Sequence, residues 1–239
     1  MSNNQWLKIG SNWLNLSAQR SEGWYNARKG RITASNFATA IGISIFSTAE
    51  QLADDITGIK KKVVTKQSQE LMDYGTEHED DARKWYERIS GNKVEEIGLI
   101  VPEWQPLLGC SLDGCVLEAN KEPWQTDGMI EIKCPKKFYQ PLNHYMLNQS
   151  LGWQPEENDH NHIWPSHWCQ IQGCLAITEK KWCDYVVFCQ PEKKVFVERI
   201  NFDSHFWLDT LLPKLTNFIT NELEPRLNKQ NIKVEIPDL

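Results

Sequence analysis

The spacing of apolar residues changes near residue 90, from a helical to a strand-like period, and this change limits the fold more than any other feature. Between Gln69 and Ile89, apolar and small residues recur every three or four positions, which predicts one long helix with a single buried face. That face comprises Leu71, Gly75, His78, Ala82, Trp85 and Ile89. Glu79 falls at its edge, so we expect a half-buried carboxylate there.

Beyond this helix the apolar segments are short and bounded by Gly, Pro or Asn, a pattern typical of strands. They are rich in Val, Ile, Leu and Cys, and they cover residues 93–101, 108–112, 115–119, 128–134, 183–190 and 194–200. Residues 190–193 are predicted to form the hairpin turn between the last two strands.

Helical patterns lie on both sides of the strand region in the sequence. The predicted helices cover residues 22–30, 35–42, 48–58, 137–147, 165–178 and about 204–227, and a polar loop covers 148–163. This order predicts one domain over residues 1–239 of the α/β or α+β class, with a central mixed β-sheet flanked by helices, and α/β is the class we expect. Its core is expected at about residues 22–200.

Composition and charge exclude several classes of protein. The chain has 32 acidic and 26 basic residues and a net charge of −6, whereas proteins that coat nucleic acid non-specifically are normally basic. DNA remains an allowed substrate, because an active site needs only a local positive channel. No apolar run approaches the roughly 18 residues of a membrane span. No secretory signal is visible, so we expect the chain to stay in the cytoplasm.

The cysteines and tryptophans favour structural roles. None of the seven cysteines has C-x-x-C spacing, and most alternate with apolar residues, so we expect small buried hydrophobes. This pattern argues against a zinc or redox protein and against an iron–sulfur cluster. The eleven tryptophans, Trp24 among them, are expected mainly in the core.

Charged residues around two predicted strands carry the chemistry. On a strand, residues two positions apart share a face, so Glu131 and Lys133 project together while their apolar neighbours pack on the other face. Asp113 ends a preceding strand, and a hairpin can place it beside Glu131. Carboxylates that converge in this way are costly unless a cation lies among them, and their hard oxygen atoms suit magnesium or manganese.

Such a site suits phosphodiester hydrolysis, because a divalent ion polarises a phosphate oxygen and lowers the pKa of a bound water. Simpler interpretations exist for each part. An Asp-Gly pair between strands is most often only a turn, and a Glu-x-Lys pair on a strand is commonly solvated. The two occur here at compatible spacing, which favours the catalytic interpretation.

Four sequence blocks, in this order, resemble the lambda-exonuclease / YqaJ-type viral recombinase family of PD-(D/E)xK nucleases. The blocks are Trp24–Ser35, Gly75–Arg83, Cys110–Gly114 and Glu131–Pro135, and Gln170–Gln172 completes the order. The resemblance spans about residues 22–190 and implies a restriction-endonuclease-like core.

The resemblance also implies a metal site and a catalytic lysine. Asp113, Glu131 and the backbone carbonyl of Ile132 would bind Mg²⁺, with Mn²⁺ as the alternative ion. Glu79 would contact a second ion or its water, which gives two ions per site.

Lys133 would be the catalytic lysine, and Gln170 would be a polar residue of the same site. The family usually has proline before the catalytic aspartate, where this chain has Leu112. Because proline supplies no ligand, we expect the site to survive.

Two further groups of residues would bind DNA. Arg28 and Ser35 match positions that hold a 5′-phosphate in the family, and a guanidinium can grip a terminal phosphate with two hydrogen bonds. Lys136 and Lys137 follow the catalytic strand and could line the DNA path, as could residues 60–62. Three histidines, His160, His162 and His167, lack the ordered spacing of a zinc site and are expected to be exposed.

The resemblance implies a 5′-to-3′ exodeoxyribonuclease that acts on linear double-stranded DNA ends. It would leave 3′ single-stranded overhangs for phage-type recombination, with a single-strand annealing protein as partner and a trimeric ring as assembly. Two alternatives stay open: a structure-specific or restriction-type endonuclease on the same core, and a catalytically inactive DNA-end-binding module.

Overall fold

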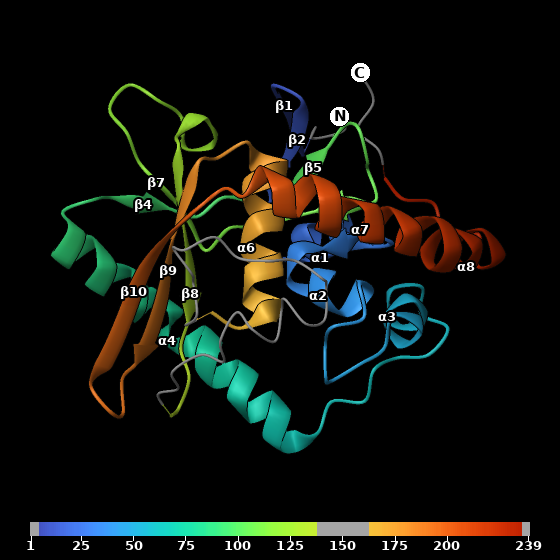
Figure 1. The fold of residues 1–239 in the computed structure, drawn as a ribbon, viewed down its shortest axis with the longest axis horizontal. Helices are drawn as coiled ribbons and strands as arrows, with labels where there is room; N and C mark the ends of the chain where they lie inside the picture. Colours follow the sequence, from blue (N-terminus) through green and yellow to red (C-terminus); the bar gives the residue numbers. More distant parts are fainter. Residues whose placement is uncertain (1–4, 138–162, 236–239) are drawn as a thin grey trace.

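A five-stranded mixed sheet runs through the computed structural model, which describes residues 5–137 and 163–235 (Figure 1). Its strand order is β10–β9–β8–β7–β4. Strands β8 and β9 are parallel, and the other neighbouring pairs are antiparallel. The strands are β4 (Val94–Glu95), β7 (Gly114–Val116), β8 (Gly128–Lys133), β9 (Trp182–Cys189) and β10 (Lys194–Asn201). The predicted fold class, a central mixed sheet flanked by helices, is confirmed.

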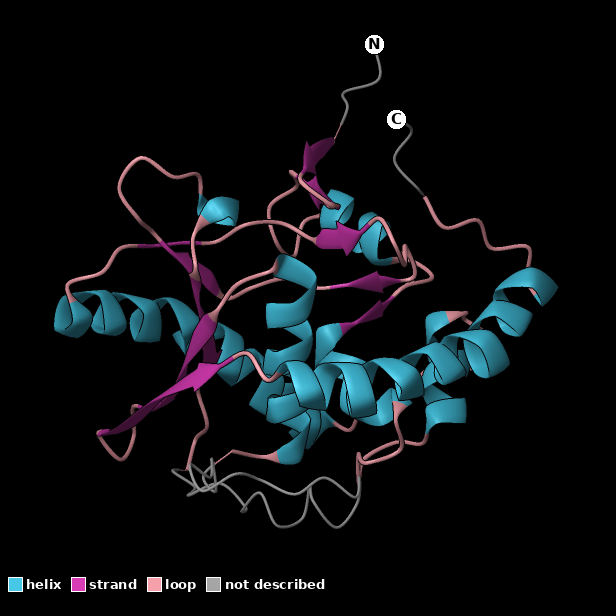
Figure 2. Cartoon of the chain, turned by 45° about the horizontal axis from the view of Figure 1, so that its top comes forward, coloured by secondary structure: helices cyan, strands magenta, loops and turns pink. Residues whose placement is uncertain are grey.

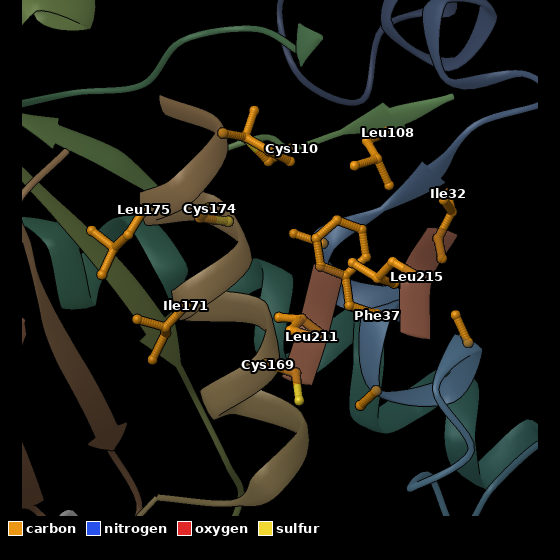
Figure 3. Packing of buried hydrophobic residues seen from close by; sticks show 14 of the residues in the cluster. Ile32, Phe37, Leu108, Cys110, Cys169, Ile171, Cys174, Leu175, Leu211 and Leu215 are labelled. Atoms are coloured by element: carbon orange, nitrogen blue, oxygen red, sulfur yellow. The ribbon is translucent and has the colours of Figure 1, made fainter. Parts of the chain in front are cut away.

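Helices α4 (Lys66–Ser90) and α6 (Pro165–Thr178) cover opposite faces of this sheet. Ala82 and Tyr86 of α4 pack in one apolar cluster with Ile130 and Ile132 of β8. The other face of the sheet belongs to the main core around α6 (Figure 3). Figure 2 shows the end of α4 on one side of the strands and the other long helices on the opposite side. Successive residues of β8 therefore face two different environments.

Residues 5–125 add short helices and two small sheets. The helices are α1 (Glu22–Arg28), α2 (Phe37–Ala40), α3 (Ala49–Ile56) and the short 3₁₀ turns η1 (Ala34–Asn36) and η2 (Pro123–Gln125). Strands β1 (Trp6–Ile9), β2 (Asn12–Asn15) and β5 (Ile100–Pro102) form one small sheet, and β3 (Ile32–Thr33) pairs with β6 (Leu108–Gly109) in the other. The Ser21 side chain caps α1 and the Thr48 side chain caps α3, so both helices begin where the sequence offers a hydroxyl.

The C-terminal helix follows the prediction but contains wide turns. It runs through η3 (Phe206–Leu211), α7 (Leu212–Phe218), η4 (Ile219–Leu223) and α8 (Glu224–Lys229), and the η3 and η4 segments are π-helical. Pro213 and Pro225 follow these two segments. Proline lacks an N–H and crowds the preceding turn, so a wider turn accommodates it without ending the helix.

The predicted buried face of α4 was wrong at both ends. Leu71 and Ile89 are 50% and 53% exposed, whereas Tyr86, which the pattern did not select, is 1% exposed. Because α4 is longer than the sheet is wide, only its middle turns find apolar partners. Tyr86 is buried there, where its hydroxyl donates to Asp184 Oδ2 at 2.6 Å.

The remaining differences concern strands. The predicted strand at 93–101 is split into β4 and β5, which belong to different sheets. Strands β1 and β2 were not predicted, because the buried Asn12 and Asn15 hide the apolar pattern of β2. The predicted helix at 137–147 beyond Lys137, and the loop at 148–163 before Ile163, lie outside the described residues.

All seven cysteines, each in the described part of the chain, are buried free thiols, as the sequence predicts. Among the helices at residues 5–137 and 163–235, none is both long enough and apolar enough to cross a membrane.

Two Gly→Ala substitutions should have opposite effects on stability. A Cβ at Gly173 in α6 would lie 2.4 Å from the ring of Phe37, whereas a Cβ at Gly75 in α4 would have its nearest neighbour at 3.9 Å. We expect Gly173→Ala to lower the free energy of unfolding by about 2 kcal/mol through overpacking. Gly75→Ala should raise it by about 1 kcal/mol through helix propensity. Urea unfolding of both variants tests this, and equal effects would contradict it.

Candidate active site

Asp113 lies directly before β7, and its carboxylate reaches the far end of β8. β7 and β8 pair antiparallel with Gly114 opposite Ile130. Past the end of this pairing, the Asp113 carboxylate takes the place of a backbone partner, because its Oδ2 accepts a hydrogen bond from the Ile132 amide at 2.7 Å. The hairpin arrangement expected from the sequence is thus present.

Glu131 and Lys133 share the face of β8 opposite the α4 cluster, as strand alternation predicts. The Lys133 ammonium donates to Glu131 Oε1 at 2.5 Å and to Gln170 Oε1 of α6 at 3.3 Å. The structure therefore brings Asp113, Glu131, Lys133 and Gln170 together at one end of β8.

The Glu131 carboxylate is enclosed by protein. Its exposed fraction is 0%, and its Oε2 atom has no hydrogen-bond partner within residues 5–137 and 163–235. Burial raises the pKa of Glu131, the negative charge of Asp113 raises it further, and Lys133 opposes both effects. An ionised carboxylate with an unpartnered buried oxygen is costly without a positive ligand.

Glu79 of α4 is held by two arginines. Its Oε2 lies 2.5 Å from Arg20 Nη2, and its Oε1 lies 3.5 Å from Arg83 Nη2. Its side chain is 12% exposed, so the carboxylate is partly buried as expected. Burial and the charge of Asp113 raise the pKa of Glu79, and Arg20 lowers it. Glu79 is therefore electrostatically linked to the site but already paired with cations.

The residues present fit a divalent ion held by Asp113 and Glu131. Both offer hard carboxylate oxygens, and Oε2 of Glu131 has no hydrogen-bond partner among the described residues. The described residues contain no group of three or more His, Cys, Asp or Glu side chains arranged for a metal. Because Mg²⁺ takes about six oxygen ligands, two carboxylates alone would leave positions for backbone oxygen, water or substrate.

The expected phosphate-binding corner lies on α1 and the turn that follows it. The Arg28 guanidinium stacks on the Trp24 ring at 4.2 Å and donates to Thr33 Oγ1 at 2.9 Å. Burial lowers the pKa of Arg28 to about 10, which leaves it cationic at neutral pH. Ser35 follows Arg28 closely in the sequence; it lies in η1, and its side chain is exposed. Trp24 is buried, as predicted, and its Nε1 donates to Ser111 Oγ at 2.9 Å.

The lysines proposed to line the DNA path are all exposed. Lys136 and Lys137 follow β8, and the Lys136 ammonium lies 5.1 Å from the centre of the Tyr74 ring. Residues 60–62 are exposed after α3.

His167 was expected to be exposed in a loop, and this prediction was wrong. Helix α6 begins at Pro165, so His167 lies in its first turn and faces the sheet, where Nδ1 is 2.7 Å from the Tyr185 hydroxyl. Burial and the positive charge of Lys133 lower its pKa. His160 and His162 lie outside the described residues.

In a comparison with protein-family models, residues 23–181 match the YqaJ-like viral recombinase domain. This match covers more than half of the chain and contains Arg28, Asp113, Glu131 and Lys133. The chain belongs to this family. The resemblance inferred from the sequence blocks is thus confirmed.

Three solved structures that are similar to this YqaJ-like domain are exonucleases. An alkaline exonuclease (LHK-Exo) from Laribacter hongkongensis has a TM-score of 0.62 and 25% identity, over 88% of this chain and 96% of that chain. LHK-Exo in complex with dAMP gives a TM-score of 0.61 and 24% identity, over 88% and 98% of the two chains. A phage-related exonuclease from Haemophilus somnus 129PT gives 0.51 and 11%, over 84% and 95%, which shows the fold alone. A comparison with curated proteins found no match.

Sequence reasoning missed three residues that touch the site of the YqaJ-like domain. Arg83 lies four residues after Glu79 on α4, a spacing that could have revealed the pair. Gln19 and Arg20 lie in an irregular segment before α1 and gave no periodic signal. By contrast, Gln172, close to Gln170 in sequence, binds the backbone at Asn201 O and Asp203 N.

The same Asp→Asn change should have opposite effects at Asp113 and at the buried Asp184. Asp113 repels Glu131 and Glu79, so Asp113→Asn should raise the free energy of unfolding by about 1 kcal/mol in chelator. Asp184 receives two hydrogen bonds from Arg199, at 2.8 Å each, so Asp184→Asn should lower it by about 2 kcal/mol. Unfolding in EDTA measures both, and a destabilised Asp113→Asn would contradict the repulsion.

Proposed function

We propose that this YqaJ-like domain is a metal-dependent exodeoxyribonuclease. It acts from the 5′ end of linear double-stranded DNA and leaves a 3′ single-stranded overhang. The family and its solved neighbours support a DNA exonuclease. The observation that carries the proposal is the convergence of Asp113, Glu131 and Lys133 at the end of β8, with a buried carboxylate oxygen left unpartnered.

In this proposal Asp113, Glu131 and the Ile132 carbonyl hold Mg²⁺, or Mn²⁺ in its place. A bound divalent ion supplies charge neutralisation at the phosphate and a more acidic water. A second ion, or its water, would contact Glu79 through Oε1, which accepts no hydrogen bond from residues 5–137 and 163–235, while Oε2 stays with Arg20.

Lys133 is positioned to orient the attacking water or to stabilise negative charge on the phosphate. Gln170 keeps the Lys133 ammonium at the site by accepting a hydrogen bond from it. Arg28, aided by Ser35, would hold the 5′-phosphate, and Lys136 and Lys137 would contact the DNA backbone. The Trp24–Ser111 hydrogen bond links this corner to the segment that carries Asp113, which supports cleavage at a fixed distance from the end.

The proposal extends to partners of the domain. A 3′ overhang is a substrate for a single-strand annealing protein, as phage-type recombination requires. A homotrimeric ring around DNA would make degradation processive. In this proposal, DNA degradation and strand annealing both take place in the cytoplasm of a bacterial or phage-infected cell.

Replacement of the catalytic lysine should abolish cleavage without loss of the fold. Lys133→Ala should reduce the rate of 5′-strand loss from linear duplex DNA with Mg²⁺ by about 100-fold or more, because a preorganised charge at the phosphate is removed. A gel-based time course with a closed circle and an EDTA arm measures this. Lys181→Ala is the matched control, since Lys181 is exposed at the opposite end of the β8–β9 pair.

Each alternative function predicts a different result in that assay. Cleavage of the closed circle would indicate an endonuclease. Binding of DNA ends without cleavage in Mg²⁺ or Mn²⁺ would indicate an inactive end-binding module.

Removal of the guanidinium should erase the preference for a 5′-phosphate. Arg28→Ala should reduce the ratio of rates on 5′-phosphorylated and 5′-hydroxyl duplexes by about tenfold or more, because a charge-assisted hydrogen bond to the terminal phosphate is lost. Rates on both substrates give the ratio. Arg88→Ala, at the exposed end of α4, is the control, and an unchanged ratio in Arg28→Ala would place the phosphate elsewhere.

A further inference from the structure

Gln19 lies between β2 and α1, in a segment where the sequence predicts no element. Its side-chain nitrogen donates to two backbone carbonyls, Ile97 O and Leu112 O, each at 2.8 Å. A primary amide carries two N–H hydrogens, so one group satisfies both carbonyls. These two carbonyls come from segments far apart in sequence, and Leu112 directly precedes Asp113.

Gln19 binds the chain at the point where backbone-to-backbone hydrogen bonding between the segments of Ile100 and Cys110 ends. The backbones of Ile100 and Cys110 exchange two hydrogen bonds, at 2.8 and 2.9 Å. Two residues further on, the Leu112 carbonyl is bound by the Gln19 amide instead. Without that amide, the carbonyl oxygens of Ile97 and Leu112 would face each other with no donor between them, which favours opening of the turn.

The other groups around this turn are also fixed by hydrogen bonds. Arg83 Nε donates to the Asp113 carbonyl at 3.1 Å, and the Ile132 amide donates to the Asp113 carboxylate at 2.7 Å. The carbonyls on both sides of the Asp113 side chain are thus held by side-chain donors. Leu112, unlike a proline, leaves its own φ free, so the turn depends on these contacts.

We propose that Gln19 is a positioning residue of the active site. By holding the Leu112 carbonyl, it fixes the turn that places the Asp113 carboxylate against β8. The inference rests on the proposed role of Asp113 in catalysis. Whether Gln19 holds this turn in place can be measured without metal or DNA.

The direct test is amide hydrogen exchange in the metal-free protein, measured by NMR. Gln19→Met keeps the length of the side chain but removes both donors. We expect exchange at the Ile132 amide to accelerate about tenfold relative to Val186 of the neighbouring strand, because the acceptor Asp113 is displaced more often. An unchanged ratio of the two exchange rates would overturn the proposal.

Two further variants separate positioning from general stability. Gln172→Met removes a fully buried amide that binds Asn201 and Asp203, so it should destabilise the protein without changing the Ile132 ratio. Gln19→Lys retains a donor and should preserve more of the Ile132 protection than Gln19→Met. If the Lys and Met variants were equally impaired, the donor would not be the cause, and the proposal would fail.

The functional consequence is measured with Mn²⁺ alone and then with DNA. Gln19→Met should weaken Mn²⁺ binding, followed by electron paramagnetic resonance, by about tenfold. It should also lower kcat while the KM for DNA ends stays unchanged, since Arg28 is untouched. Unmodified protein that fails to cleave linear DNA would refute the proposed nuclease and leave the exchange result standing. Normal exchange and normal Mn²⁺ binding in Gln19→Met would refute the positioning role even in an active nuclease.

Discussion

The burial of one carboxylate, Glu131, explains the arrangement of groups around it. A carboxylate enclosed between a sheet and a helix cannot be solvated, so its environment must supply positive charge and hydrogen bonds. Lys133 supplies the charge from the same strand, and Gln170 on α6 keeps that lysine in place. Asp113 adds a second negative charge and makes the cluster more costly. The repulsion between these carboxylates lowers the stability of the fold at the place where a cation and a phosphate are proposed to bind.

The sequence reveals this cluster because strand alternation is strict. Glu131 and Lys133 must share a face whatever surrounds them, and the antiparallel hairpin brings Asp113 to the same edge. The mixed sheet and most helices were also predictable, because their apolar periods survive in the sequence. The burial of Tyr86 could not be predicted from the sequence, since it depends on where α4 crosses the sheet. Gln19 could not be predicted either, because its two acceptors lie about 80 and 90 residues away along the chain and leave no local pattern.

The two proposed functional regions are joined by side chains rather than by a shared element. Trp24 stacks under Arg28 and donates to Ser111, next to the segment that carries Asp113. Arg31, three residues after the end of α1 at Arg28, donates to the carbonyls of Ala27 and Pro106, at 2.5 and 2.8 Å. The end of α1 is therefore fixed from several directions. An enzyme that measures from a DNA end to a cleavage site needs a rigid separation of this kind.

The two ends of the described chain also meet. Trp6 of β1 donates through its indole nitrogen to Glu235 at 3.0 Å, and Arg31 donates to the backbone carbonyl of the same residue. A fold whose ends lie together can be inserted into a longer polypeptide, or have its ends joined and new ones opened elsewhere, without disturbing its core.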